Sequence, residues 1–169
     1  MRTIPVILIA LVLSACTAAV DSGDAVSPDA PDTTTSSATL AMPPQIADFR
    51  VKEVQVGDRL LTLAIADNPS LRQQGLMGVT DLGDLDGMLF FWRHDGDPFW
   101  MKDTLIPLDI VWFNEDGTYK DRASMVPCTE DPCERYFPAD GLEFRYAIEA
   151  APGTLDYITE SSTIQYTDD

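Results

Sequence analysis

The chain has 169 residues, of which 45% are hydrophobic and 23% charged, and this suits one globular domain with some additional non-globular sequence. Acidic residues outnumber basic ones 28 to 11, which gives a formal net charge of −17. Such a chain repels phosphate backbones and lacks the basic surface of a nucleic-acid-binding protein. We therefore expect no nucleic-acid partner.

The first fifteen residues are typical of a secretory signal peptide. Arg2 precedes an apolar run over residues 4–13, which is too short for a permanent membrane-spanning helix. The sequence Leu13-Ser14-Ala15-Cys16 then resembles the bacterial lipobox, in which cleavage occurs before a cysteine that afterwards carries lipid. We expect residues 1–15 to be removed and Cys16 to anchor the protein to the membrane of the bacterial cell envelope, facing the periplasm or the exterior. An ordinary signal peptide that happens to contain a cysteine is the alternative.

The next segment is expected to be a tether. Residues 17–45 consist mainly of Ser, Thr, Asp, Ala and Pro and show neither helical nor strand periodicity. Such a composition cannot bury enough apolar surface to offset the entropy lost on ordering. We expect a lipidated cysteine and a disordered tether over residues 16–45, followed by a single folded domain over residues 46–169.

The folded part begins with a predicted hairpin and a short helix. Two runs rich in β-forming residues, 51–56 and 61–65, flank a turn at Gly57-Asp58-Arg59. The sequence Asp67-Asn68-Pro69 then offers a capping residue and a proline for the first helical turn, and Gly75 is suited to end the helix.

Six further segments are candidate strands. They are residues 88–92, 98–104, 108–113, 118–126, 144–150 and 163–166. Turn signals such as Asn114-Glu115-Asp116-Gly117 recur at the short spacing typical of antiparallel proteins. A second short helix is expected over residues 153–158. The predicted fold class is mostly β (β-rich α+β): an antiparallel sandwich or barrel-like domain of about eight strands with two short helices.

Two cysteines remain if Cys16 is lipidated. Cys128 and Cys133 are separated by four residues in an exported and therefore oxidising setting, where an even pair usually forms a disulfide. A redox dithiol more often has two intervening residues, and a metal site needs more ligands than these cysteines and the lone His94 supply. A disulfide is the favoured interpretation.

Recognisable catalytic and cofactor motifs are missing from the sequence. The acidic stretch over residues 81–87 does not fit an EF-hand, because Leu82 and Arg93 would then occupy ligand positions. There is no dinucleotide-binding or P-loop glycine pattern and no evident nucleophile. We assign no catalytic residue, no metal ligand and no cofactor.

The densest cluster of informative side chains lies over residues 99–113. On a strand, Trp100, Lys102 and Thr104 share one face. An aromatic ring beside a cation and a hydroxyl is what a small polar ligand or a glycan would require.

Asp109 follows these residues and lies among apolar residues on a face that looks buried, so its carboxylate needs a partner. Lys102, Arg72 and Arg145 are the candidate cations. The predicted ligand-binding residues are Trp100, Lys102, Thr104, Asp109 and Arg72; the alternative is a purely structural buried ion pair with Trp100 filling the core.

Several segments of the chain resemble a known family when taken in order. They are Arg72-Gln-Gln-Gly75-Leu76-Met77, Gly87-Met88-Leu89-Phe90, Phe99-Trp100-Met101-Lys102-Asp103-Thr104, Ile106-Pro107-Leu108-Asp109 and the loop from Pro127 to Cys133. They resemble the signatures of the bacterial and archaeal domain of unknown function 192, over about residues 50–168. The resemblance implies a compact, mostly β, exported or membrane-tethered domain with no established activity. The family often has Asn at Asp103 and a basic residue at Val79; if these positions line a site, this chain has a more acidic version.

Three hypotheses for the function remain open. The first is a lipid-anchored envelope protein whose β domain binds a small ligand, a glycan or a protein partner. The second is an envelope enzyme that uses Lys102 and Asp109 for acid/base chemistry. The third is a structural accessory module. The absence of a recognisable nucleophile, metal set or cofactor motif favours binding.

Overall fold

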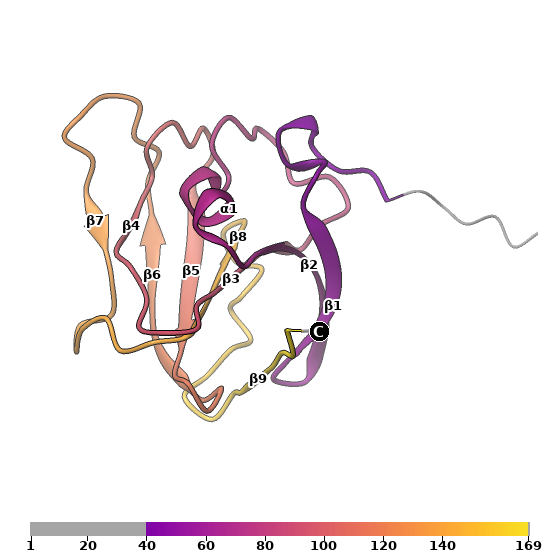
Figure 1. The fold of residues 1–169 in the computed structure, drawn as a ribbon, viewed down its shortest axis with the longest axis vertical. Helices are drawn as coiled ribbons and strands as arrows, with labels where there is room; N and C mark the ends of the chain where they lie inside the picture. Colours follow the sequence, from indigo (N-terminus) through magenta and orange to yellow (C-terminus); the bar gives the residue numbers. More distant parts are fainter. Residues whose placement is uncertain (1–39, 169) are drawn as a thin grey trace, which may run out of the picture. The chain divides into compact units, whose positions relative to one another are not determined.

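A computed structural model describes residues 40–168 (Figure 1). The expected signal peptide, the lipidated Cys16 and the tether as far as residue 39 lie outside the described residues, so these remain predictions. Within the described part of the chain, no helix is long and apolar enough to span a bilayer.

The structure is a curled sheet of seven strands accompanied by a small two-stranded sheet (Figure 1). The elements in chain order are η1 (Pro44–Ile46), β1 (Arg50–Val56), β2 (Arg59–Ala66), α1 (Pro69–Gln74), β3 (Gly87–Phe91), β4 (Phe99–Trp100), β5 (Leu108–Phe113), β6 (Tyr119–Met125), β7 (Arg135–Tyr136), β8 (Tyr146–Ala150) and β9 (Ile164–Gln165). The strand order is β6-β5-β8-β3-β2-β1-β9 in the large sheet, and β4 pairs with β7. The mostly β, sandwich-like fold class predicted from the sequence is confirmed.

The predicted hairpin and the helix after it both form. β1 and β2 pair in antiparallel register around the turn at Gly57, whose φ of 56° favours glycine. Asn68 caps α1, because its side-chain oxygen accepts a hydrogen bond of 3.1 Å from the backbone N–H of Leu71. Gly75, with φ 48°, ends the helix as expected.

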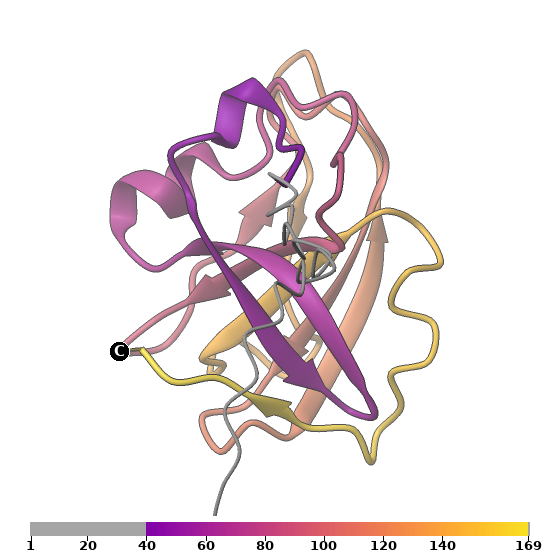
Figure 2. The same cartoon turned by 90° about the vertical axis from the view of Figure 1, so that its right-hand side faces the viewer.

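One strand pair departs from the expected antiparallel arrangement. β2 and β3 run parallel, with Leu63 opposite Gly87. Parallel neighbours need a crossover connection rather than a tight turn, and residues 67–86 supply one that contains α1. Figure 2 shows the β1–β2 hairpin in front, with the short β9 beside the end of β1, where Ile164 pairs with Val56.

The predicted strand over residues 98–104 is shorter than expected. Phe99 and Trp100 pair with Tyr136 and Arg135 of β7, a strand that the sequence did not reveal, and Lys102 forms only an isolated bridge with Cys128. The chain leaves the extended conformation at Asp103, whose φ is 53°, and the N–H of Thr104 turns back to bond the carbonyl of Met101 at 3.1 Å. With the unexpected β7, residues 40–168 contain nine strands rather than about eight.

The helix predicted over residues 153–158 is wrong. The segment is a run of turns in which N–H groups bond carbonyls three residues back, as from Asp156 to Gly153 and from Ile158 to Leu155. Gly153 has a φ of 85°, which interrupts helical geometry at its start. Leu155 and Ile158 are nevertheless buried against the sheet.

The compact part begins before the predicted boundary at residue 46. Ile46 ends η1 and is completely buried, and the N–H of Ala41 donates to the carboxylate of Asp84 at 2.8 Å. These contacts tie residues 41–46 to the domain.

The central strands of the large sheet are buried on both faces. Alternate residues of a strand point to opposite faces, and here both sets are apolar. One face carries the cluster that includes Met88, Ile110 and Ala147. The opposite face carries the cluster that includes Leu89 and Val111. A polar side chain on these strands therefore needs a specific partner or an opening.

Candidate functional site

A pocket of about 250 Å³ opens beside α1. Helix α1 and the loop after it form one part of the lining, and strands β3 and β8 contribute Phe90 and Glu149. The small sheet contributes Phe99 and Trp100 of β4 and Arg135 of β7. The pocket therefore lies where the helix, the large sheet and the small sheet meet.

Aromatic rings form much of the wall. Phe90 packs edge to face against Phe99 at 5.0 Å, and Trp92 packs against Phe99 in the same manner at 5.7 Å. These three side chains are buried and belong to the core. Trp100, the neighbour of Phe99, is only half-buried, so part of its ring remains open to a ligand.

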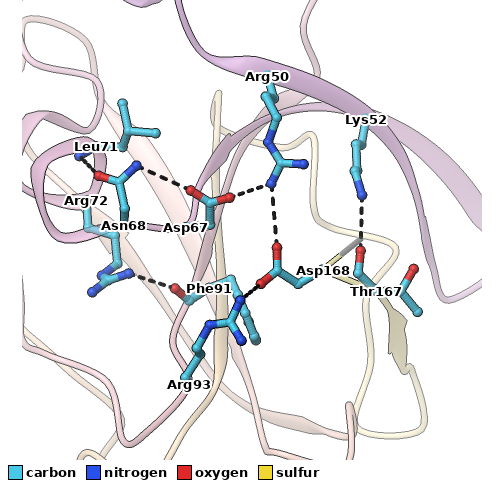
Figure 3. A network of polar contacts seen from close by, with 10 residues as sticks. All are labelled: Arg50, Lys52, Asp67, Asn68, Leu71, Arg72, Phe91, Arg93, Thr167 and Asp168. Carbon is cyan, nitrogen blue, oxygen red and sulfur yellow. Dashed lines mark hydrogen bonds and ion pairs between the residues drawn. The ribbon is translucent and has the colours of Figure 1, made fainter.

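Two arginines lie over tryptophan rings at this pocket. The guanidinium of Arg72 lies 5.2 Å from the ring centre of Trp92, and that of Arg135 lies 4.1 Å from the ring centre of Trp100. Arg72 also donates from Nη1 to the carbonyl of Phe91 at 3.0 Å (Figure 3). Burial lowers the pKa of Arg72, although an arginine stays charged at any ordinary pH.

The position of Arg72 is supported by the network drawn in Figure 3. The residue lies on α1, whose N-terminal cap Asn68 donates to the carboxylate of Asp67 at 3.4 Å. Asp67 in turn pairs with Arg50 of β1. The helix that carries Arg72 is thus linked to the first strand of the large sheet.

Glu149 is the buried carboxyl group of the pocket. It is 4% exposed, and its register opposite Met88 and Ile110 places its side chain on the same face as theirs. Among residues 40–168 its side chain forms no hydrogen bond or ion pair. Burial raises the pKa of Glu149 to about 8, so at neutral pH it is mainly a neutral carboxylic acid that can donate one hydrogen bond and accept others.

A second carboxylate, Asp97, also lines the pocket but is exposed. It accepts a hydrogen bond of 3.1 Å from Nε1 of Trp92. This contact fixes the indole that supports Arg72.

The structure brings three of the five predicted ligand-binding residues to this pocket. Arg72, Trp100 and Thr104 line it, and Thr104 is 4% exposed. Lys102 and Asp109 are not part of the lining. Lys102 forms an ion pair of 2.9 Å with Asp131, and the hydrogen bond to this carboxylate raises the pKa of Lys102. Whether any of the five binds a ligand stays a prediction.

The expectation that Asp109 pairs with a cation is wrong. Its carboxylate accepts hydrogen bonds from the hydroxyl of Ser124 at 2.6 Å and from the N–H of Gly153 at 2.9 Å. The predicted partners are occupied elsewhere: Arg145 pairs with Glu115 at 3.0 Å, and Lys102 with Asp131. Two neutral donors are sufficient, because hydrogen bonds to a charged acceptor are stronger than those between neutral groups.

The predicted disulfide between Cys128 and Cys133 is present, with the two Cα atoms 5.8 Å apart. Its loop is attached to the segment that follows β4, because the N–H of Cys128 bonds the carbonyl of Met101 and the N–H of Asp103 bonds the carbonyl of Cys128. The disulfide loop therefore braces the turn that carries Thr104 into the pocket.

The two positions expected to make a site more acidic lie outside the pocket lining. Asp103 is exposed and has a positive φ, a conformation that Asn and Asp adopt more readily than most residues. Val79 is completely buried in the core. Among residues 40–168 there is also no group of three or more His, Cys, Asp or Glu side chains that could hold a metal ion.

The most informative pocket residue, Glu149, was missed by the sequence reasoning. Its signal was available, because it is an acidic residue inside the apolar run Tyr146-Ala-Ile-Glu-Ala150. Asp109 carries the same signal, an acidic residue among apolar ones on a strand. Arg135 carried no comparable signal, since its strand of two residues lies in a loop-rich segment and its proximity to Trp100 depends on the tertiary fold.

Comparisons with known proteins agree with the fold. The chain is 27% identical to a protein of unknown function from Novosphingobium aromaticivorans DSM 12444, with 77% of this chain and 94% of that chain covered and a TM-score of 0.63. It is 25% identical to a putative transcription regulator from Sinorhizobium meliloti 1021, with 69% and 94% covered and a TM-score of 0.58. No curated protein matches the chain significantly. The sequence profile of DUF192, described as "Uncharacterized ACR", matches residues 51–165, and the chain therefore belongs to this family.

Proposed function

We propose that this protein is a lipid-anchored envelope protein whose β domain binds a small polar ligand in the pocket beside α1. The observation that carries the proposal is the carboxyl group of Glu149. This residue is buried and lines the pocket, and its carboxyl group has no hydrogen-bonding partner among the described residues. Because the described residues give this carboxyl group no hydrogen bond and it opens onto the pocket, a ligand there can supply the partner.

The remaining lining supports the same proposal. Small-molecule sites combine apolar and aromatic walls with a few polar groups that orient the ligand. Here Phe90, Phe99 and Trp100 supply the apolar surface, and Thr104 and Glu149 supply polar groups. A volume of about 250 Å³ suits a ligand of about the size of one sugar ring.

A catalytic role for Lys102 and Asp109 receives less support. A general base needs a pKa close to the working pH, whereas the contact with Asp131 raises the pKa of Lys102. The carboxylate of Asp109 is held by Ser124 and Gly153 on the other side of the sheet. Both side chains are accounted for by structural contacts.

The binding proposal is tested by a thermal-shift screen of the full-length protein against sugars, sugar acids and other envelope metabolites. A ligand that binds only the folded state raises the melting temperature. Trp100→Ala should abolish this rise, and the matched variant Phe137→Ala should keep it, because Phe137 is a 50% exposed aromatic residue outside the pocket. Absence of any shift with the wild type, or equal shifts in both variants, would contradict the proposal.

The envelope anchor is a separate part of the proposal. It rests on the signal-like segment, on the lipobox-like sequence that ends in Cys16, and on a disulfide of the kind found in exported proteins. The intact mass of the protein from the membrane fraction tests it, and we expect a mature chain that begins with an acylated Cys16. A soluble mature form with an unmodified Cys16 would contradict it.

A further inference from the structure

The two arginines at the pocket differ from most cations in the described part of the chain. Ion pairs with carboxylates are formed by Arg50, Arg93, Lys102, Lys120, Arg122 and Arg145. Arg72 and Arg135 have no carboxylate within ion-pair distance among residues 40–168, although the protein contains 28 acidic residues. Each lies over a tryptophan ring instead, and both line the same pocket.

A guanidinium that lies over an aromatic ring keeps N–H donors at its edge. Arg72 uses one of these donors for the carbonyl of Phe91, whereas the guanidinium of Arg135 forms no hydrogen bond or ion pair within residues 40–168 and lies over the Trp100 ring. The remaining donors match the oxygen atoms of a carboxylate or phosphate, which arginine binds through paired hydrogen bonds.

The acidic groups of the pocket do not cancel these charges at neutral pH. Asp97 contributes one negative charge; it accepts a hydrogen bond from the indole N–H of Trp92 and also acts electrostatically on Arg72, so it offsets only one of the two arginine charges. Glu149 contributes little charge, because burial raises its pKa to about 8. The lining therefore carries a net positive charge in a protein whose formal net charge is −17, and such a local contrast favours anionic ligands over neutral ones.

We propose that the pocket takes a small hydroxylated anion, whose carboxylate or phosphate group is held by Arg72 and Arg135 and whose hydroxyl groups bond Glu149 and Thr104. This inference rests on the proposed binding function and specifies the chemical class of the ligand. Sugar acids and polyol phosphates share this chemistry and are small enough for a pocket of about 250 Å³.

The test uses probes in matched pairs that differ in charge. D-glucuronate is compared with D-glucose, and glycerol 3-phosphate with glycerol, by isothermal titration calorimetry of the full-length protein at pH 7 and low ionic strength. At least one anion should bind about tenfold or more tightly than its neutral counterpart. The preference should weaken as salt is added, because salt screens the attraction between charges. The pair that responds tells whether a carboxylate or a phosphate is the preferred anion.

Substitutions locate the binding to the arginines. Arg135→Gln should weaken anion binding about tenfold and reduce the preference for the anion over its neutral counterpart. Arg135→Lys should recover only part of the loss, because lysine keeps the charge but not the paired donors. The matched control is Arg59→Gln: Arg59 lies 4.1 Å from the ring centre of Tyr157, is exposed and is outside the pocket. This control should bind the anion like the wild type.

The outcomes separate this inference from the binding function itself. Equal affinities within each pair would overturn the preference for anions and leave the binding of small ligands intact. If Arg59→Gln and Arg135→Gln lose the same affinity for the anion, the placement of the anion at the pocket is overturned. Failure of all four probes to bind would overturn this ligand class, and the wider thermal-shift screen then decides the proposed function alone.

Discussion

Asp109 and Glu149 are buried carboxyl groups on neighbouring strands of one sheet, and they have opposite surroundings. Asp109 of β5 lies opposite Ala150 and Ser124, whereas Glu149 of β8 lies opposite Ile110 and Met88. Because register positions alternate between faces, the two side chains lie on opposite faces of the sheet. Asp109 is 7% exposed and Glu149 is 4% exposed, so burial alone does not distinguish them.

Their hydrogen bonds do distinguish them. Asp109 connects β5 to β6 through Ser124 and to the turns after β8 through Gly153, which makes it part of the scaffold. Glu149 has no comparable contact in the described residues and faces the pocket. A buried carboxyl group with two donors stabilises a fold, whereas one that opens onto a pocket without a donor stays available to a ligand. This contrast predicts opposite responses to mutation.

The largest effect is expected for Glu149→Gln at alkaline pH. The pKa of Glu149 is raised from 4.5 to about 8, so between these values the folded state keeps a proton that the unfolded state releases. Stability of the wild type is therefore lost as pH rises through this window, by on the order of 4 to 5 kcal/mol in total. Glutamine does not titrate, so the variant should become increasingly more stable than the wild type and the difference should level off above about pH 8.

Urea unfolding of both proteins at several pH values across this window measures the difference. The comparison is made between variant and wild type, because other groups titrate equally in both. A stability difference that stays constant across this range would contradict the assignment of Glu149 as a buried, neutral carboxyl group.

The next largest effect separates two adjacent residues of the pocket wall. Phe99 is 7% exposed and packs against the rings of Phe90, Trp92 and Trp112, so Phe99→Ala should lower the free energy of unfolding by about 3 to 5 kcal/mol. Trp100 is half-buried and its ring contact in the structure is with Arg135. Trp100→Ala should therefore stay within about 1 kcal/mol of the wild type.

Chemical unfolding of the two alanine variants under identical conditions checks this pair. If both alanine variants lose a similarly large part of the free energy of unfolding, Trp100 belongs to the core. That result would also remove Trp100 from the pocket's ligand-accessible surface.

A smaller loss of stability is expected for Asp109→Ala. The substitution leaves the hydroxyl of Ser124 and the N–H of Gly153 without their acceptor, which should destabilise the fold by about 2 to 4 kcal/mol. Asp109→Asn keeps one acceptor oxygen and should lose less. Differential scanning calorimetry measures both variants, and a wild-type melting temperature for Asp109→Ala would contradict the scaffold role.

Much of the fold could be predicted because its signals are local. Alternating β-forming residues with a Gly57 turn predicted the first hairpin, and Asn68, Pro69 and Gly75 predicted both ends of α1. The short segments were less predictable. β4 and β7 have two residues each, and such strands are stabilised by tertiary contacts rather than by their own sequence pattern.

The site was predictable only in part for the same reason. Trp100 and Thr104 were recognised from one segment, and both line the pocket. The partner of Asp109 was predicted to be a cation, but backbone and hydroxyl donors satisfy it, and such donors exist throughout any sequence. Bringing Arg135 close to Trp100 requires the pairing of β4 with β7, which follows from the whole fold.

The smallest effect is expected at a carboxylate whose partners are two exposed arginines, which extends the comparison to a third environment. Asp168 pairs with Arg93 and with Arg50, and Figure 3 shows it between the two guanidinium groups. The side chain of Arg93 is 79% exposed, so water and salt compete with this pair. Asp168→Asn should therefore lower the free energy of unfolding by no more than about 1 kcal/mol, with less effect at high salt. Urea unfolding at low and high sodium chloride concentration measures this change. A loss of unfolding free energy above about 2 kcal/mol that persists at high salt would contradict the prediction. The network in Figure 3 would then stabilise the domain as strongly as the buried contacts of Asp109 do.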